Sequence, residues 1–188
     1  SLRQIANLTG KHRTRLARDV RLTYASTVRH ICDGIRKLAA VATAEELAAP
    51  LYRGVRGELP NAFWFPDEQG MVIATDAAFM STSMARETPL HYMGGEKNVL
   101  WELRPGPQTD EAFHRGADVA MLSQFAAERE VLFPPCTMLR VLRRDAGGEA
   151  EGAAAAGADR RHAGLRVNSD CFELQKRFIA IEVQPSFV

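Results

Sequence analysis

The chain is poor in cysteine, because its 188 residues include only Cys32, Cys136 and Cys171. Three scattered cysteines cannot build the disulfide framework typical of small secreted domains. No Cys-x-x-Cys pair is present to indicate a zinc site, so we expect no metal. The scarcity of cysteine favours an intracellular, reducing setting, although the sequence by itself does not name a compartment.

Long apolar runs and an excess of one charge are also absent. No stretch approaches the ~20 apolar residues needed to cross a bilayer. No N-terminal segment combines a basic start, an apolar core and a small-residue cleavage site. The 24 Lys and Arg residues nearly balance the 23 Asp and Glu residues, which leaves a net charge of +1. This balance disfavours a nucleic-acid partner, and the lack of apolar runs disfavours a membrane segment.

Four common signatures of nucleotide-binding and hydrolytic enzymes are missing as well. The sequence contains no Gly-x-Gly-x-x-Gly, Gly-x-x-x-x-Gly-Lys-Ser/Thr, His-Glu-x-x-His or Gly-x-Ser-x-Gly. Rossmann, P-loop, zincin and α/β-hydrolase folds therefore lack sequence support. No internal repeat is visible, and the length suits one domain with its own core over residues 1–188.

Residues 1 to about 48 carry a helical pattern. Thr43 and Glu46 have the spacing of a capping box for a short helix, which Pro50 stops. Before them, apolar side chains recur every three or four positions, which predicts one apolar face of a helix. These residues are Leu16, Val20, Tyr24, Val28 (or Thr27), Ile31, Ile35 and Leu38.

From Leu51 onward the pattern changes to short apolar strands separated by Gly and Pro. In the last of them, Ile179, Ile181 and Val183 alternate as candidates for a buried face. Residues 85–96 are predicted to be a polar connector, and 145–164 an inserted, mobile loop without an assigned role. The strands are expected at about 51–57, 71–73, 78–84, 98–103, 130–133, 137–142 and 172–183. The sequence thus predicts an α+β domain with a helical part over 1–48 and a β-rich part over 51–188.

Two polar features stand out within these strands. Arg53 follows the core-like residues Leu51 and Tyr52, and a buried arginine is costly unless an anion accompanies it. Its neighbour Gly54 would let a ligand approach the backbone closely. Further along, three hydroxyl residues at positions 81–83 end an apolar strand and offer hydrogen-bond partners.

A third polar feature is the acid pair Glu128 and Glu130, which precedes the short apolar run 131–133 and two prolines. Residues two apart on a strand share a face, so we expect the two carboxylates side by side at a strand's entrance. Each of the three features alone has an ordinary explanation: an arginine reaching solvent from a sheet edge, a strand end, and a solvated acid pair. Their joint occurrence gives them weight.

In this order and with these flanks, the three features resemble the fingerprint of the arginine-specific mono-ADP-ribosyltransferase family: an arginine, a Ser-Thr-Ser strand and a Glu-x-Glu. The matching segments are Leu-Tyr-Arg-Gly at 51–54, Phe-Met-Ser-Thr-Ser at 79–83 and Glu-Val-Leu-Phe-Pro-Pro at 130–135. The similarity covers roughly residues 51–142. It implies N-terminal helices packed on a split, mostly antiparallel β core, with NAD in the cleft between two sheets. It also implies transfer of ADP-ribose from NAD to an arginine of a protein target.

The resemblance also assigns roles to the residues of the three motifs. Arg53 is expected to hold the NAD diphosphate with its rigid guanidinium. Glu130 would stabilise the positive charge that develops on the ribose as nicotinamide leaves, as in glycoside hydrolysis. Ser81 would steady Glu130 or the ribose. Glu128 would bind and deprotonate the incoming guanidinium, and it could also deprotonate a Ser or Thr hydroxyl.

The remaining expected contacts involve the backbone and aromatic side chains. Phe125, in the loop before the acids, either helps to position the target protein or packs in the core. The other candidates for NAD contact are Gly54, whose backbone would face the nicotinamide amide, Thr82 and Ser83, which support the strand, and an aromatic beside the nicotinamide ring, which is Tyr92 or Phe79.

Two other functions are compatible with the same residues. An NAD glycohydrolase would hand the ribosyl cation to water, and a non-catalytic domain would bind NAD or another protein. The acid pair argues against the non-catalytic domain, because binding alone does not need it. The chain also lacks the cysteine framework expected of the secreted, surface-anchored members of the family, and the sequence does not reveal the target protein.

Overall fold

The computed structural model describes residues 24–95, 97–107, 109, 112–142 and 167–188. Its α-helices are α3 (Ala25–Ala40), α4 (Ala44–Ala48) and α5 (Glu87–Tyr92), and its short 3₁₀ turns are η1 (Asn61–Trp64), η2 (Ala120–Leu122) and η3 (Ala126–Glu128). The predicted capping box begins α4, because the Thr43 hydroxyl accepts from the Glu46 N–H and the Glu46 carboxylate accepts from the Thr43 N–H. None of the helices in the described ranges is both long and apolar enough to span a membrane.

The strands form one mostly antiparallel sheet. Its order is β2-β7-β9-β4-β1-β3-β6-β5, with β8 paired to β9 outside this path. The strands are β1 (Leu51–Arg56), β2 (Ile73–Asp76), β3 (Met80–Ser83), β4 (Asn98–Leu103), β5 (Ala117–Asp118), β6 (Glu130–Phe133), β7 (Thr137–Val141), β8 (Val167–Glu173) and β9 (Lys176–Ser186). Among the described strand pairs only β4 and β9 run parallel. The predicted α+β class with a mostly antiparallel sheet is confirmed.

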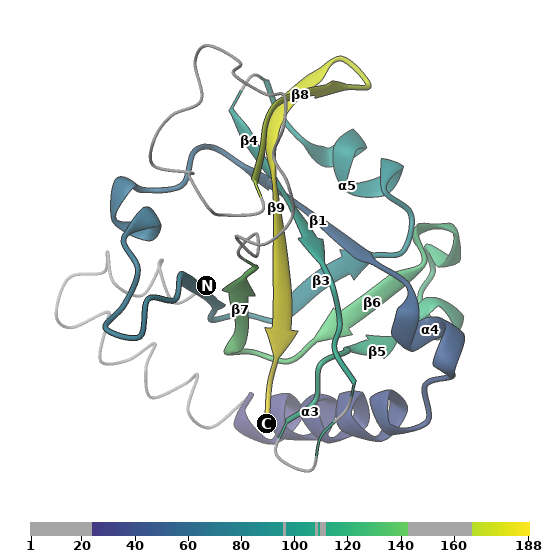
Figure 1. Ribbon diagram of the computed structural model, residues 1–188. Helices are drawn as coiled ribbons and strands as arrows, with labels where there is room; N and C mark the ends of the chain where they lie inside the picture. Colours follow the sequence, from purple (N-terminus) through teal and green to yellow (C-terminus); the bar gives the residue numbers. More distant parts are fainter. Residues whose placement is uncertain (1–23, 96, 108, 110–111, 143–166) are drawn as a thin grey trace, which may run out of the picture.

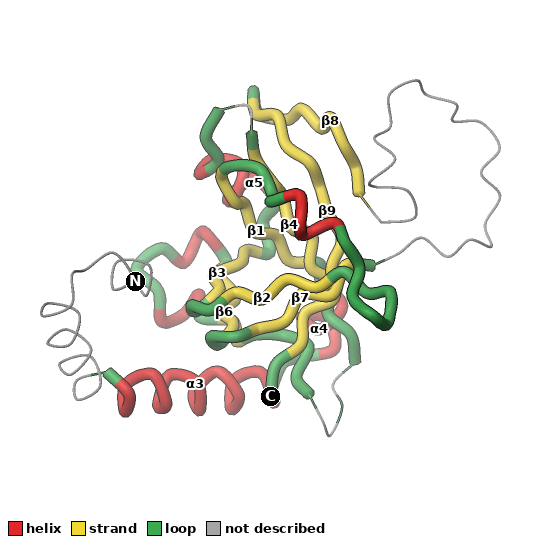
Figure 2. The backbone as a smooth tube through the Cα atoms, turned by 90° about the vertical axis from the view of Figure 1, so that its left-hand side faces the viewer, coloured by secondary structure: helices red, strands yellow, loops and turns green. Residues whose placement is uncertain are grey.

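The sheet nearly divides between β1 and β3. In the described chain one register pair, Tyr52 with Ser83, joins these strands. By contrast, β1 pairs with β4 along its whole length, and β3 does so with β6. Figure 2 shows β1, β4, β8 and β9 in the upper part of the sheet, with β3 and β6 below them. The expected split is thus present as two parts of one sheet that share a single bridge.

The main core lies on one face of the central strands β4 and β9. Val99, Trp101 and Leu103 of β4 pair in register with Ile179, Ile181 and Val183 of β9. Ile181 and Val183 are completely buried, and Ile179 is partly buried against the same core. The predicted alternation is therefore confirmed. Full burial of each such aliphatic side chain contributes about 1.5–3 kcal/mol to stability.

Three predicted boundaries are wrong. The strand expected at 71–73 is β2, which begins only at Ile73 and ends at Asp76. Residues 85–96 contain the helix α5 as well as a connector, and Pro89 is tolerated because it lies in the first turn, where N–H groups lack helical partners. The expected last strand, 172–183, contains a turn: Phe172 belongs to β8, and β9 starts at Lys176. Leu174 and Gln175 make this turn with positive φ angles of 48° and 60°. The predicted loop at 145–164 lies outside the described residues.

The apolar face of α3 is less buried than its spacing predicts. Ile35 joins the main core, and Ala39 is buried too. The other described positions of the predicted apolar face remain 38–59% exposed: Tyr24, Val28, Ile31 and Leu38. Periodicity shows which residues share a helix face, but only packing decides how much of that face is covered. Leu16 and Val20 lie outside the described residues.

The helical part is attached to the sheet through a buried arginine. α3 packs against β5, as Figure 1 shows at the bottom of the molecule. Arg115, just before β5, is 1% exposed, and its guanidinium donates to the Ala49 carbonyl at the end of α4, at 3.2 Å. Burial lowers the pKa of Arg115, and the charges of Glu46 and Asp118 oppose this shift.

Candidate active site

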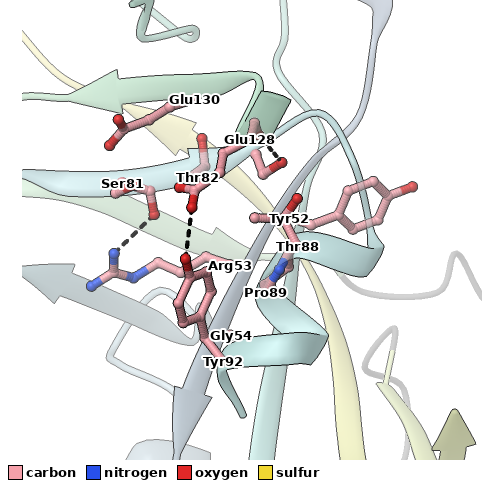
Figure 3. A pocket seen from close by; sticks show the side chains of 11 residues that line it. Tyr52, Arg53, Gly54, Ser81, Thr82, Thr88, Pro89, Tyr92, Glu128 and Glu130 are labelled. Carbon is pink, nitrogen blue, oxygen red and sulfur yellow. Dashed lines mark hydrogen bonds between the residues drawn. The ribbon is translucent and has the colours of Figure 1, made fainter. Parts of the chain in front are cut away.

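A cleft opens where β1 and β3 separate. Four segments that are distant in the sequence line it: Tyr52, Arg53 and Gly54 of β1, Ser81, Thr82 and Ser83 of β3, Thr88, Pro89 and Tyr92 of α5, and the acids Glu128 and Glu130 (Figure 3). Its volume is about 200 Å³. Sites that enclose a whole drug-sized ligand measure roughly 300–1,000 Å³, so a dinucleotide bound here would be partly exposed to solvent.

Arg53 is held in this cleft from two sides. Its two terminal nitrogens donate to Asp76 Oδ2 at 2.7 Å and to the Ser81 carbonyl at 2.9 Å. Asp76 is itself fixed, because its Oδ1 accepts from the Ala78 N–H at 3.1 Å. A guanidinium has five N–H donors, so these two bonds orient Arg53 and leave further donors for an anionic ligand. Sequence reasoning missed Asp76, because an acid at a strand end is too common to be singled out.

Glu128 and Glu130 both line the cleft, but they do not belong to one strand. η3 ends at Glu128, Arg129 takes the left-handed conformation (φ 48°, ψ 52°), and β6 begins at Glu130. The predicted pair of neighbouring strand residues is therefore wrong, because face alternation holds only for extended backbone. In Figure 3 the Glu130 carboxylate lies on the side of Ser81 and Arg53, and Glu128 lies towards Tyr92.

The hydroxyls of β3 hold the acid-bearing segment in place. The Ser83 hydroxyl donates to the Glu128 carbonyl at 2.6 Å, and the buried Thr82 hydroxyl donates to the Val131 carbonyl at 2.7 Å. A left-handed residue other than glycine costs on the order of 1 kcal/mol or more, so these bonds help to offset the strain at Arg129. Thr82 and Ser83 thus have the supporting geometry expected of them, and their contact with NAD stays a prediction.

Gly54 allows α5 to lie directly against β1. A Cβ at this position would be 2.9 Å from the Pro89 carbonyl oxygen and 3.1 Å from Met93 Cε. Any larger residue would push the helix away and reshape one wall of the cleft. The expected contact of the Gly54 backbone with nicotinamide stays a prediction, and close packing is a second reason for a glycine here.

Tyr92, the last residue of α5, reaches across the cleft. Its hydroxyl donates to Glu128 Oε1 at 2.6 Å. This hydrogen bond, together with the negative charge of Glu128, raises the pKa of Tyr92. The phenol therefore remains a donor at neutral pH. Phe79 packs against the main core instead, and it is not one of the described residues that line the cleft. Of the two aromatic candidates, Tyr92 is the one placed at the site.

The connection between β5 and β6 carries exposed apolar side chains a few positions before Glu128 in the sequence. Phe125 is 61% exposed, so the alternative that it is a core residue is wrong. Met121 and Leu122 of the same connection are 89% and 73% exposed. Sequence reasoning missed these two, although two large apolar residues in a predicted loop were the available signal. Their exposure leaves them open to contact with another molecule.

The described part of the chain contains no group of three or more His, Cys, Asp or Glu side chains arranged to hold a metal ion. The cleft itself contains one fixed guanidinium, hydroxyls and two carboxylates. Such a set can bind an anionic ligand, stabilise developing positive charge and accept a proton.

Comparison with protein-family models and with curated proteins finds no match. Among solved structures, the ADP-ribosyltransferase HopU1 of Pseudomonas syringae pv. tomato is 17% identical, with a TM-score of 0.47 over 85% of this chain and 54% of HopU1. The Vis toxin, an ADP-ribosyltransferase from Vibrio splendidus, is 16% identical, with a TM-score of 0.45 over 95% of this chain and 64% of Vis. The chain thus spans about half the length of HopU1 and somewhat under two thirds of Vis.

A third similar structure is the catalytic domain of VahC from Aeromonas hydrophila. It is 18% identical, with a TM-score of 0.42 over 94% of this chain and 75% of the VahC domain.

Proposed function

We propose that the protein transfers ADP-ribose from NAD to the guanidinium group of an arginine on a protein target. The observation that carries this proposal is the convergence of a cation, a hydroxyl and a carboxylate, those of Arg53, Ser81 and Glu130, on one cleft. A dinucleotide that is cleaved at its ribose needs three such groups. The cation holds the diphosphate, the hydroxyl positions the ribose, and the carboxylate stabilises the positive charge on the ribose.

The reaction would begin at the bond between nicotinamide and ribose. As this C–N bond breaks, its electron pair leaves with nicotinamide, and the ribose acquires oxocarbenium-like positive charge. Glu130 stabilises that charge as it develops, so its interaction is stronger in the transition state than with bound NAD. A guanidinium nitrogen of the acceptor then forms the new bond to the anomeric carbon.

Glu128 would serve the acceptor rather than NAD. A carboxylate and a guanidinium can form two parallel hydrogen bonds, which favours arginine over other acceptors. As the new C–N bond forms, Glu128 takes the proton that the guanidinium loses. The exposed Phe125 lies in the same connection, where it would contact the surface of the target protein around its arginine.

The proposal is tested by incubating the protein with isotopically labelled NAD and a proteome extract, followed by site mapping with mass spectrometry. Labelled arginine together with released nicotinamide supports transfer. Free ADP-ribose without labelled protein would instead identify a glycohydrolase. NAD binding without nicotinamide release would identify a non-catalytic NAD-binding domain, and the proposal would then be wrong.

The variant Glu128→Gln separates the acceptor step from NAD cleavage. We expect it to reduce transfer to a guanidinium acceptor by about 10²-fold, the lower range of general-base effects, and NAD hydrolysis by much less. The reason is that glutamine keeps the size of the side chain but cannot accept the proton. Chromatography that quantifies each product separately measures the rate of transfer and the rate of hydrolysis. Glu45→Gln, at an exposed position on α4, is the matched control, and equal losses of both activities would refute the acceptor role.

A further inference from the structure

The hydrogen bond between Tyr92 and Glu128 joins two separate walls of the cleft. Tyr92 ends α5, and Glu128 ends η3 in the connection before β6. The bond is short, at 2.6 Å between the phenol oxygen and Oε1, and the occupied oxygen faces across the cleft towards α5 (Figure 3). One carboxylate oxygen of the proposed acceptor base is therefore already engaged by a side chain of this protein.

We propose that Tyr92 caps Glu128 until a guanidinium acceptor arrives and thereby suppresses hydrolysis of NAD. Tyr92 is then a positioning residue that determines which nucleophile reaches the base. This inference rests on the proposed transferase function and adds to it a determinant of acceptor selectivity.

The two competing nucleophiles differ in how well they can displace the phenol. A guanidinium brings a positive charge and donates to both carboxylate oxygens in a bidentate pair, whereas the neutral phenol donates one hydrogen bond to one oxygen. Water is neutral and binds one oxygen at a time, so it gains nothing by displacing Tyr92. The phenol also persists as a donor, because Glu128 raises the pKa of Tyr92.

Both reactions can use Glu128 as the proton acceptor, but slow background hydrolysis also proceeds while Glu128 is capped, with the proton passing to solvent. In hydrolysis assisted by uncapped Glu128, the bond between ribose and nicotinamide breaks with its electron pair on nicotinamide, the water oxygen bonds to the anomeric carbon, and Glu128 takes a water proton. In transfer, a guanidinium nitrogen replaces the water oxygen, and Glu128 takes a guanidinium proton. Access to Glu128 therefore sets the ratio of the two products. This also explains why Glu128→Gln should affect hydrolysis little: the wild-type base is capped when only water is present.

The variant Tyr92→Phe tests the cap, because it removes the hydroxyl and keeps the ring. We expect NAD hydrolysis without an acceptor to rise about fivefold, a factor equivalent to one net hydrogen bond. With agmatine as a small guanidinium acceptor, KM should fall by a similar factor, while kcat of transfer stays within about twofold. Chromatographic separation of ADP-ribosylagmatine from free ADP-ribose gives the ratio. Hydrolysis at or below the wild-type rate would overturn the proposal.

Two further variants exclude a merely structural effect. The double variant Tyr92→Phe/Glu128→Gln should hydrolyse NAD as slowly as Glu128→Gln alone, because the freed base is missing. If hydrolysis stays raised in the double variant, the effect does not pass through Glu128 and the proposal is wrong. Tyr24→Phe is the matched control, since Tyr24 is 59% exposed on the N-terminal side of α3 and should leave the product ratio unchanged.

A measurement without NAD distinguishes failure of the cap from failure of the proposed function. If the wild-type protein releases no nicotinamide from NAD, the transferase proposal fails. Calorimetric titration of agmatine into the NAD-free protein still tests the cap, because Tyr92→Phe should bind agmatine about fivefold more tightly than wild type. Equal or weaker binding by the variant would contradict competition between the phenol and the guanidinium.

Discussion

Glu130→Ala is expected to slow nicotinamide release from NAD by about 10²–10³-fold, the effect of removing one group that stabilises a developing charge. The affinity for NAD should stay within a few-fold, because the diphosphate contact proposed for Arg53 is untouched and the role proposed for Glu130 lies mainly in the transition state. Glu130 is the first residue of β6 and only half-buried, so the substitution should not disturb the fold. Chromatography of released nicotinamide and calorimetry of NAD binding provide the two measurements.

The matched control is Glu45→Ala, which removes an exposed carboxylate from α4 and should leave turnover unchanged. If Glu130→Ala releases nicotinamide at the wild-type rate, the catalytic role proposed for Glu130 is wrong. A protein that loses NAD affinity and turnover together would place Glu130 in ground-state binding rather than in catalysis, which is a different role from the one proposed.

Gly116→Ala is expected to destabilise the protein by about 3 kcal/mol, the upper range for overpacking. A Cβ at this position would lie 2.3 Å from the carbonyl oxygen of Leu132 and 2.9 Å from a ring carbon of Phe133. The oxygen belongs to the backbone of β6, so the strand that begins with Glu130 would have to move. Domains are stable by only about 5–15 kcal/mol in total, so this loss is large. The free energy of unfolding in urea measures it.

Gly34→Ala is the control for this prediction, because it makes the same chemical change where space is available. A Cβ on Gly34 meets no atom within 4 Å, and Gly34 lies in the interior of α3. The substitution should therefore stabilise the protein by about 0.5–1 kcal/mol through helix propensity. If Gly116→Ala and Gly34→Ala have equal free energies of unfolding, the close approach of position 116 to β6 is wrong.

Features that depend on neighbouring residues were predictable from the sequence. Thr43 and Glu46 are one helical turn apart, so their capping box depends on little beyond that turn. The alternation of Ile179, Ile181 and Val183 predicted a buried strand face for the same reason. Boundaries were less predictable where residues with weak turn preference reverse the chain, as Leu174 and Gln175 do between β8 and β9.

In the candidate site, too, features set by neighbouring residues were predictable and those set by distant contacts were not. Its strand-borne residues were found, because Arg53 and Ser81 lie on the predicted strands β1 and β3. The relation between the two acids was predicted wrongly, since the left-handed conformation of Arg129 is held by a bond from Ser83 to Glu128, which are 45 positions apart. Asp76 was missed, because its importance arises only from its contact with Arg53.

The sequence by itself determined the α+β class, the capping box of α4, the buried face of β9 and the chemical groups available to the site, because each of these follows from local periodicity or residue type. Only the tertiary structure decided that β1 and β3 part after a single bridge, that Asp76 orients Arg53 and that Tyr92 engages Glu128. These contacts join residues distant in the chain, and their geometry depends on how whole strands and helices pack.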